Sequence, residues 1–204
     1  MNIQELKDLQ PLVYQQFVTI LEQGRLAHAY LFSGDFASFE MALFLSQALF
    51  CQEKIGVHPC GKCRSCRLIE SNDFSDVTIV APQGNFIKTD TIRELVKNFS
   101  QSGFESSQQV FIIRDAEKMH VNAANSLLKV IEEPQSTIHI FLLTNQEEAV
   151  LPTIKSRTQI ISFPQNLPYL ERFLEEEGLL KTQASLIARL VSSQEEAKRL
   201  ATNK

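Results

Sequence analysis

The sequence is poor in glycine and proline, and it lacks an excess of basic residues. Only 7 of its 204 residues are glycine and 7 are proline, while 44% are hydrophobic. This composition excludes disorder for most of the chain and predicts an ordinary buried core. The 20 lysines and arginines are outnumbered by 24 acidic residues, which gives a net charge of −4. A broad basic face for phosphate backbones is therefore excluded, so any contact with nucleic acid is local or shared with partners.

Long apolar runs and a secretion signal are also absent. No apolar stretch approaches the roughly 20 residues that span a bilayer. The first residues, MNIQELKD, lack a basic segment followed by an apolar one. We therefore expect a cytoplasmic protein that does not associate with membranes.

Cysteine is missing from all of the chain except one short segment. Its four cysteines, Cys51, Cys60, Cys63 and Cys66, are spaced as C-x8-C-x2-C-x2-C. A reducing compartment disfavours disulfides, and four thiolates close the tetrahedral shell that zinc prefers. Because a closed shell leaves no position for water, the spacing predicts a structural zinc site. An iron–sulfur cluster and a thiol switch are the alternatives, and His58 is a rival ligand, although a solvated loop position suits it better.

Short apolar runs alternate with helical patterns through about residue 163. The apolar runs predict buried strands at residues 29–32, 77–80, 110–113, 138–143 and 159–163. Helical patterns lie between them at residues 39–50, 91–99 and 121–132. Strands joined by crossover helices predict an α/β fold with a mainly parallel sheet covered on both faces. The cysteine segment, at about residues 51–66, is then an insertion after the first of these helices.

From residue 164 the pattern is helical only. Prolines at positions 164 and 168 mark the boundary, and three helices are expected at residues 168–178, 179–191 and 194–202. The sequence thus predicts an α/β domain over residues 1–163 and a small helical domain over residues 164–204.

The loop after the first strand occupies the place of a nucleotide-binding phosphate loop but lacks its chemistry. Such a loop needs glycines, a lysine for the outer phosphates and a hydroxyl for magnesium. Here Gly34 is the glycine that remains, Glu40 stands at the lysine position and Met41 at the hydroxyl position. Phe39 adds bulk, and Arg114 follows the third strand, where a magnesium-supporting acid is expected. Taken alone, these residues favour an ordinary α/β loop.

Four acidic residues outside this loop are candidates for paired catalytic carboxylates. Asp115 and Glu117 flank a turn, whereas Glu132 and Glu133 end a helix beside Lys129, a common solvated arrangement. Since nothing there supplies a base, a nucleophile and a pocket together, we expect no catalytic centre.

Three further segments carry a family resemblance. Residues 125–134 read NSLLKVIEEP, residues 142–145 read LLTN and residues 154–158 read IKSRT. Together with the cysteine insertion and HAYLF at residues 28–32, they resemble the clamp-loader branch of the AAA+ family, found in bacterial DNA polymerase III. The resemblance covers nearly the whole chain. It implies an AAA+ parallel-sheet domain of the P-loop type with an inserted zinc module, a three-helix lid, and a C-terminal collar domain that this chain lacks.

The resemblance also implies roles for individual residues. Asn145 falls at the sensor-1 polar residue, and Ser156, Arg157 and Thr158 match the Ser-Arg-Cys motif except at its third residue. Arg157 would then be an arginine finger that acts in trans on ATP bound by a neighbouring subunit, with Ser156 beside it. Glu195 lies in the sensor-2 region, where an ATP binder carries an arginine.

Within the family, the failed phosphate loop favours the non-hydrolysing delta-prime branch. This interpretation predicts a chain that binds zinc but no ATP and is no enzyme by itself, although it belongs to a DNA-directed DNA polymerase holoenzyme. Its partners would be the gamma/tau and delta subunits, and it would reach the sliding clamp and primed DNA through the complex. The alternatives are an active clamp-loader ATPase of the gamma/tau kind and a stand-alone zinc-bearing nucleic-acid binder.

Overall fold

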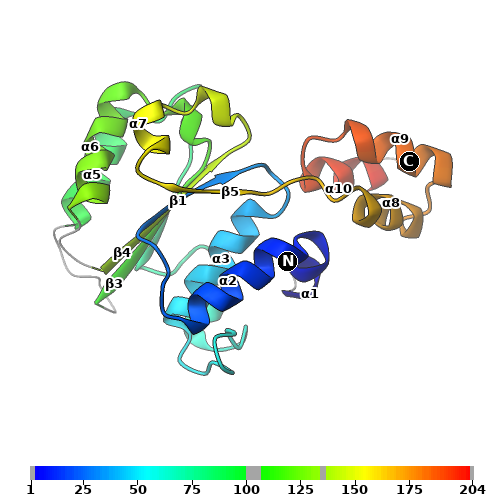
Figure 1. The fold of residues 1–204 in the computed structure, drawn as a ribbon, viewed down its shortest axis with the longest axis horizontal. Helices are drawn as coiled ribbons and strands as arrows, with labels where there is room; N and C mark the ends of the chain where they lie inside the picture. Colours follow the sequence, from blue (N-terminus) through cyan, green and yellow to red (C-terminus); the bar gives the residue numbers. More distant parts are fainter. Residues whose placement is uncertain (1–2, 100–106, 134–136, 203–204) are drawn as a thin grey trace.

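The computed structural model describes residues 3–99, 107–133 and 137–202 of the chain (Figure 1). Within these residues, five parallel strands form one sheet in the order β2-β3-β4-β1-β5. The strands are β1 (Ala29–Ser33), β2 (Val77–Val80), β3 (Gln108–Ile113), β4 (Thr137–Thr144) and β5 (Gln159–Ser162). All five lie where the sequence predicts strands, so the α/β class with a parallel sheet is confirmed.

Helices cover both faces of this sheet (Figure 1). One layer contains α2 (Pro11–Glu22) and α3 (Ser38–Phe50), with α4 (Arg64–Glu70) beside α3; the other contains α5 (Thr89–Phe99), α6 (Val121–Glu132) and α7 (Pro152–Lys155). Successive side chains of a strand point to opposite faces. Tyr30 and Phe32 of β1 therefore pack in the first layer, and Leu31 packs in the second.

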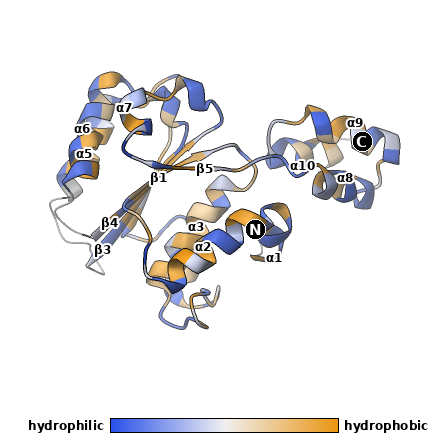
Figure 2. Cartoon of the chain, viewed as in Figure 1, coloured by the Kyte–Doolittle hydropathy of each residue, from blue (hydrophilic) through white to orange (hydrophobic). Residues whose placement is uncertain are grey.

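The N-terminal helices, α1 (Ile3–Leu9) and α2, are not anticipated by the sequence patterns above. Hydrophobic residues of α2 alternate with hydrophilic ones along the helix (Figure 2). The apolar side buries Phe17 completely, with its ring centroid 5.3 Å from that of Tyr30 and 5.6 Å from that of Phe32. The start of the chain therefore completes the core on this face of the sheet.

Residues 164–202 form the helical part: α8 (Leu167–Glu176), α9 (Lys181–Leu190) and α10 (Gln194–Thr202). It lies to one side of the sheet (Figure 1). Helix α1 links it to the α/β part, because Glu5 Oε1 accepts hydrogen bonds from Gln194 Nε2 and Lys198 Nζ, each at 2.7 Å. We propose the division between residues 163 and 164 as the domain boundary, with α1 as the bridge. None of the described helices is long and apolar enough to cross a membrane.

Candidate functional site

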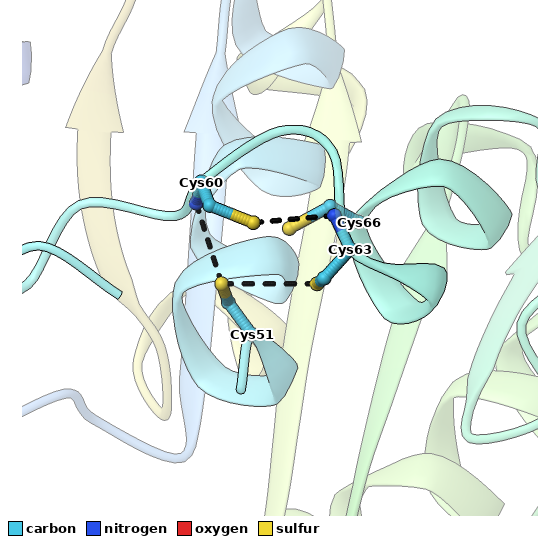
Figure 3. A group of neighbouring side chains, drawn as sticks. All are labelled: Cys51, Cys60, Cys63 and Cys66. Carbon is cyan, nitrogen blue, oxygen red and sulfur yellow. Dashed lines mark hydrogen bonds between the residues drawn. The ribbon is translucent and has the colours of Figure 1, made fainter. Parts of the chain in front are cut away.

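The four cysteines converge where α3 ends and α4 begins (Figure 3). Their sulfur atoms all lie within 4.8 Å of one another, and the Sγ atoms of Cys51 and Cys63 are 3.9 Å apart. Sulfurs bound at about 2.3 Å around one tetrahedral zinc ion would be about 3.8 Å apart. The cluster could therefore hold a metal ion such as zinc.

Backbone N–H groups help to hold these sulfurs. The N–H of Cys60 donates to Cys51 Sγ at 3.3 Å, and the N–H of Cys63 donates to Cys60 Sγ at 3.2 Å. Although burial raises the pKa of the Cys63 thiol, hydrogen bonds with the backbone of Cys66 and Gln52 lower this pKa to about 6. Such donors favour the thiolate, which is the form that ligates a metal.

His58 does not belong to this sulfur cluster. Its ring instead lies beside the ring of Tyr14, with the centroids 6.2 Å apart. The donor set is thus all sulfur, which suits zinc and, as the sequence analysis left open, an iron–sulfur cluster.

A cavity of about 300 Å³ lies at the carboxyl ends of the strands. Its lining comes from the loop after β1, the first turn of α3, the turn after β3, the end of β4 and the start of α10. These residues are Asp35, Ser38, Phe39, Glu40, Arg114, Asp115, Leu143, Thr144, Ser193, Gln194 and Glu195. The crevice at the carboxyl ends of parallel strands is the usual ligand position in open α/β sheets. The structure thus brings together the phosphate-loop position, the residue after the third strand and the sensor-2 region.

Acidic side chains outnumber basic ones in the lining of this cavity. Four carboxylates, those of Asp35, Glu40, Asp115 and Glu195, share it with the guanidinium of Arg114. Burial raises the pKa of Asp35, and the nearby charge of Asp115 raises it further. Burial likewise raises the pKa of Glu40, which lies in the first turn of α3. Negative charge is therefore already crowded where an anionic ligand would lie.

Polar side chains around this cavity are engaged by neighbouring side chains. Asn145, at the sensor-1 position, donates from Nδ2 to Asp35 Oδ2 at 3.3 Å. The guanidinium of Arg114 lies over the ring of Phe39, 4.8 Å from its centroid. Both polar groups thus bind this chain's own loop and helix α3. Met41, at the magnesium-hydroxyl position, is completely buried in the core.

Gly34 is required by the packing of this loop. Its backbone has φ +111°, and a Cβ at this position would lie 2.3 Å from the carbonyl oxygen of Phe163. Its N–H donates to the carbonyl of Thr144 at 2.8 Å. The close contact with Phe163, the residue after β5, explains why this residue is glycine. The hydrogen bond to Thr144 also occupies the Gly34 N–H, so this group is not free to donate to a phosphate.

The variant Gly34→Ala is expected to lower the free energy of unfolding by about 2–5 kcal/mol. The left-handed backbone costs about 1–2 kcal/mol, and the overlap with Phe163 adds about 1–3 kcal/mol. Gly84→Ala is the matched control, because Gly84 also has a positive φ (+77°) but a Cβ there meets nothing within 4 Å. Denaturant unfolding of both variants checks this; equal losses would show that the contact with Phe163 carries no penalty.

Arg157 lies at the amino ends of the strands, whereas the cavity lies at their carboxyl ends. It follows α7 and precedes β5, so it is at the amino end of a parallel strand. Its Nε donates to Glu132 Oε1, and its Nη1 donates to Thr153 O and Ser156 Oγ, each at 3.3 Å. The arginine side chain is 39% exposed. Arg157 and Ser156 are therefore adjacent, but neither lines this chain's cavity.

Two of the four acidic residues considered as catalytic carboxylates have partners distant in the sequence. Glu132 binds Arg157, and Glu117 Oε2 accepts a hydrogen bond from Thr144 Oγ1 at 2.6 Å. No local sequence pattern indicates either pair, because the partners are 25 and 27 residues apart. Residue 134, the last of the NSLLKVIEEP motif, lies outside the described residues.

Comparison with known proteins places these features in a family. The family described as "DNA polymerase III, delta subunit" matches residues 9–166. The DNA polymerase III subunit delta' of Bacillus subtilis is 39% identical over 202 residues, which are 98% of this chain and 61% of that protein. The delta' subunit of Pseudomonas aeruginosa is 35% identical over 160 residues, 74% of this chain and 49% of that protein. This chain thus spans about half to three-fifths of the length of these two relatives.

Solved structures share the fold at lower sequence identity. A gamma subunit-related protein of DNA polymerase III from Thermotoga maritima has a TM-score of 0.61 and 22% identity, covering 92% of this chain and 56% of that one. The RuvB Holliday junction branch migration motor of the same organism has a TM-score of 0.60 and 14% identity, covering 94% and 60%. These likenesses show the AAA+-like fold alone. The matched family and the delta' relatives show more: the chain belongs to the delta' family of DNA polymerase III, within the clamp-loader AAA+ proteins.

Proposed function

We propose that this chain is part of a non-hydrolysing delta' subunit of the DNA polymerase III clamp loader. In the cytoplasm it assembles with gamma/tau and delta subunits and helps to load the sliding clamp onto primed DNA. It holds a structural zinc ion, binds no ATP and presents Arg157 to ATP on an adjoining gamma/tau subunit. It is no enzyme by itself, although it contributes to a DNA-directed DNA polymerase holoenzyme.

The separation of Arg157 from the chain's own cavity carries this proposal. The two lie at opposite ends of the sheet, and even the four residues of β5 extend about 13 Å, further than an arginine side chain reaches. If this partly exposed guanidinium binds a phosphate, that phosphate has to come from another molecule. Arginine fingers provided in trans act in this way, by stabilising charge on the transferring phosphoryl group.

The cavity itself supports the absence of ATP binding. A triphosphate would meet the carboxylates of Asp35 and Glu40, and it would find the N–H of Gly34 already bonded to Thr144. The single guanidinium in the lining, that of Arg114, is stacked on Phe39. Phosphate loops work through several free backbone N–H groups and a lysine, whereas here the N–H of Gly34 is bonded and Glu40 stands at the expected lysine position.

The isolated chain is therefore expected to show no measurable ATP affinity. Isothermal titration with ATP and magnesium checks this, with a gamma/tau subunit as the positive control. Glu40→Lys alone should fail to restore binding, because Phe39 and the bonded N–H of Gly34 remain. Micromolar ATP binding by the unmodified chain would instead support the active ATPase of the gamma/tau kind.

The stand-alone nucleic-acid binder is the less favoured alternative, because the net charge of −4 opposes phosphate contacts. A DNA titration without partner subunits distinguishes it: tight binding by the chain alone would contradict the proposed function. Reconstitution of the full-length protein with gamma/tau and delta subunits provides the positive test, since the proposal requires a stable complex that loads clamps.

A further inference from the structure

The pair formed by Glu132 and Arg157 is the feature that the proposed function leaves unexplained. Glu132 is the last residue of α6, and Arg157 follows the short helix α7. The carboxylate accepts the hydrogen bond from Nε, the inner nitrogen of the guanidinium. Nη1 is held by Thr153 O and Ser156 Oγ. Among the described residues, Nη2 has no hydrogen-bond partner. The guanidinium is therefore held through Nε and Nη1, while Nη2 is available to donate to another molecule.

The packing of α6 against α7 fixes the distance between Glu132 and Arg157. Ile154 of α7 is completely buried in the core that it shares with Leu127 and Leu128 of α6. The N–H of Arg157 donates to the carbonyl of Ile154 at 3.1 Å, which ties the arginine backbone to this buried residue. The carboxylate therefore projects from α6 and the guanidinium from the turn after α7, and these two elements cannot easily shift relative to each other.

We infer that Glu132 is a positioning residue for Arg157: it holds Nε and leaves the outer edge of the guanidinium directed away from the chain. This inference rests on the proposed role of Arg157 in trans. A guanidinium presents its N–H donors in a rigid planar fork, so fixing Nε also fixes the direction of the remaining donors. A side chain that is already held in one conformation loses less conformational entropy on binding a phosphate than a mobile side chain does.

A role in fold stability explains the pair less well. The side chains of Glu132 and Arg157 are 47% and 39% exposed, and ion pairs with this exposure contribute little to stability in water. The same exposure leaves the outer edge of the guanidinium accessible to a neighbouring subunit. Orientation of the arginine is therefore the effect that this geometry can deliver.

The test uses the clamp loader reconstituted with gamma/tau and delta subunits and the full-length protein carrying Glu132→Ala, Glu132→Gln, Arg157→Ala or the double change. The fraction of total ATP hydrolysis that Arg157→Ala abolishes measures how much the ATP site of the adjoining subunit contributes to that total. Glu132→Ala is expected to slow hydrolysis at that site by up to about 10²-fold, the loss that a misplacement of about 1 Å can cause, with KM for ATP unchanged. Glu132→Gln retains an oxygen that accepts from Nε and should recover part of the loss.

Two comparisons separate positioning from other effects. Glu133→Ala removes the same charge from the next residue, which is also exposed, and should leave hydrolysis unchanged. Adding Glu132→Ala to Arg157→Ala should cause no further loss, because Glu132 acts only through the arginine. If Arg157→Ala slows hydrolysis but Glu132→Ala does not, or if the two losses add, the inference is wrong. If Arg157→Ala has no effect, the proposed function fails instead.

Discussion

Protein purified without chelators is expected to carry one zinc ion per chain, and Cys63→Ser is expected to lose it. The four sulfurs already lie within 4.8 Å of one another, so a metal needs little rearrangement to bind. Mutation of a residue that hydrogen-bonds to a metal ligand typically weakens metal binding roughly 10–100-fold. Removing a ligand itself should weaken zinc binding by more than this. Elemental analysis of the purified chain and of the variant checks this expectation.

The structural consequence of Cys63→Ser should remain local. Cys63 lies at the start of α4, and the carbonyl of Cys66 in that helix accepts a hydrogen bond from Gln47 of α3 at 2.9 Å. Loss of the metal is therefore expected to increase amide hydrogen exchange in residues 51–70, while β1, β3 and β4 keep their protection. Ser71→Ala removes only the hydrogen bond from the Ser71 hydroxyl to the carbonyl of Leu68, so it is the control that should leave the metal content unchanged.

Three results would contradict this account of the cysteine cluster. Protein without metal would show that the sulfurs have another role, and an absorption spectrum typical of iron–sulfur would identify a different cofactor. Global unfolding of Cys63→Ser would show that the cluster stabilises the whole domain. Cys66 is completely buried and connects the cluster to the core. Global unfolding would therefore show that the core depends on the cluster through this residue.

The strands and the cysteine cluster could be predicted because both depend on neighbours in the sequence. Buried parallel strands are continuous apolar runs, and the strand boundaries differ from the predicted ones by at most two residues. The four cysteines fall within one short segment, so their spacing alone indicated that they converge. Helices α1 and α2 were missed, although Leu6, Leu9 and Val13 recur at helical spacing and Pro11 begins α2.

The contacts between distant segments could not be predicted in this way. The approach of α10 to the loop after β1 depends on how the helical part folds back, and the family resemblance rather than periodicity indicated it. Glu132 was expected to be solvated because a helix end beside Lys129 gives no indication of a partner 25 residues later. Nor does the sequence show that the N–H of Gly34 is bonded to Thr144, which belongs to another strand. Tertiary packing decides each of these contacts.

Arg157→Ala is expected to have the largest effect on the chemistry of the assembled clamp loader. The guanidinium is always charged and planar, and arginine fingers are worth roughly 10³–10⁵ in rate at the site that they serve. A loader has several ATP sites, so total hydrolysis should fall only by the share of the adjoining site, while clamp loading slows. Arg157→Lys should rescue poorly, because an ammonium is a point charge without the planar fork.

Folding, zinc content and assembly should be unaffected by Arg157→Ala, since the side chain is 39% exposed and its ion pair with Glu132 contributes little to stability. Arg189→Ala, which removes an exposed arginine of α9, is the control for loss of one positive charge. Steady-state ATP hydrolysis and clamp loading on primed DNA, measured with each full-length variant in the reconstituted complex, provide the readout. A complex that contains Arg157→Ala, assembles normally and works at the unmodified rate would show that Arg157 has no role in trans.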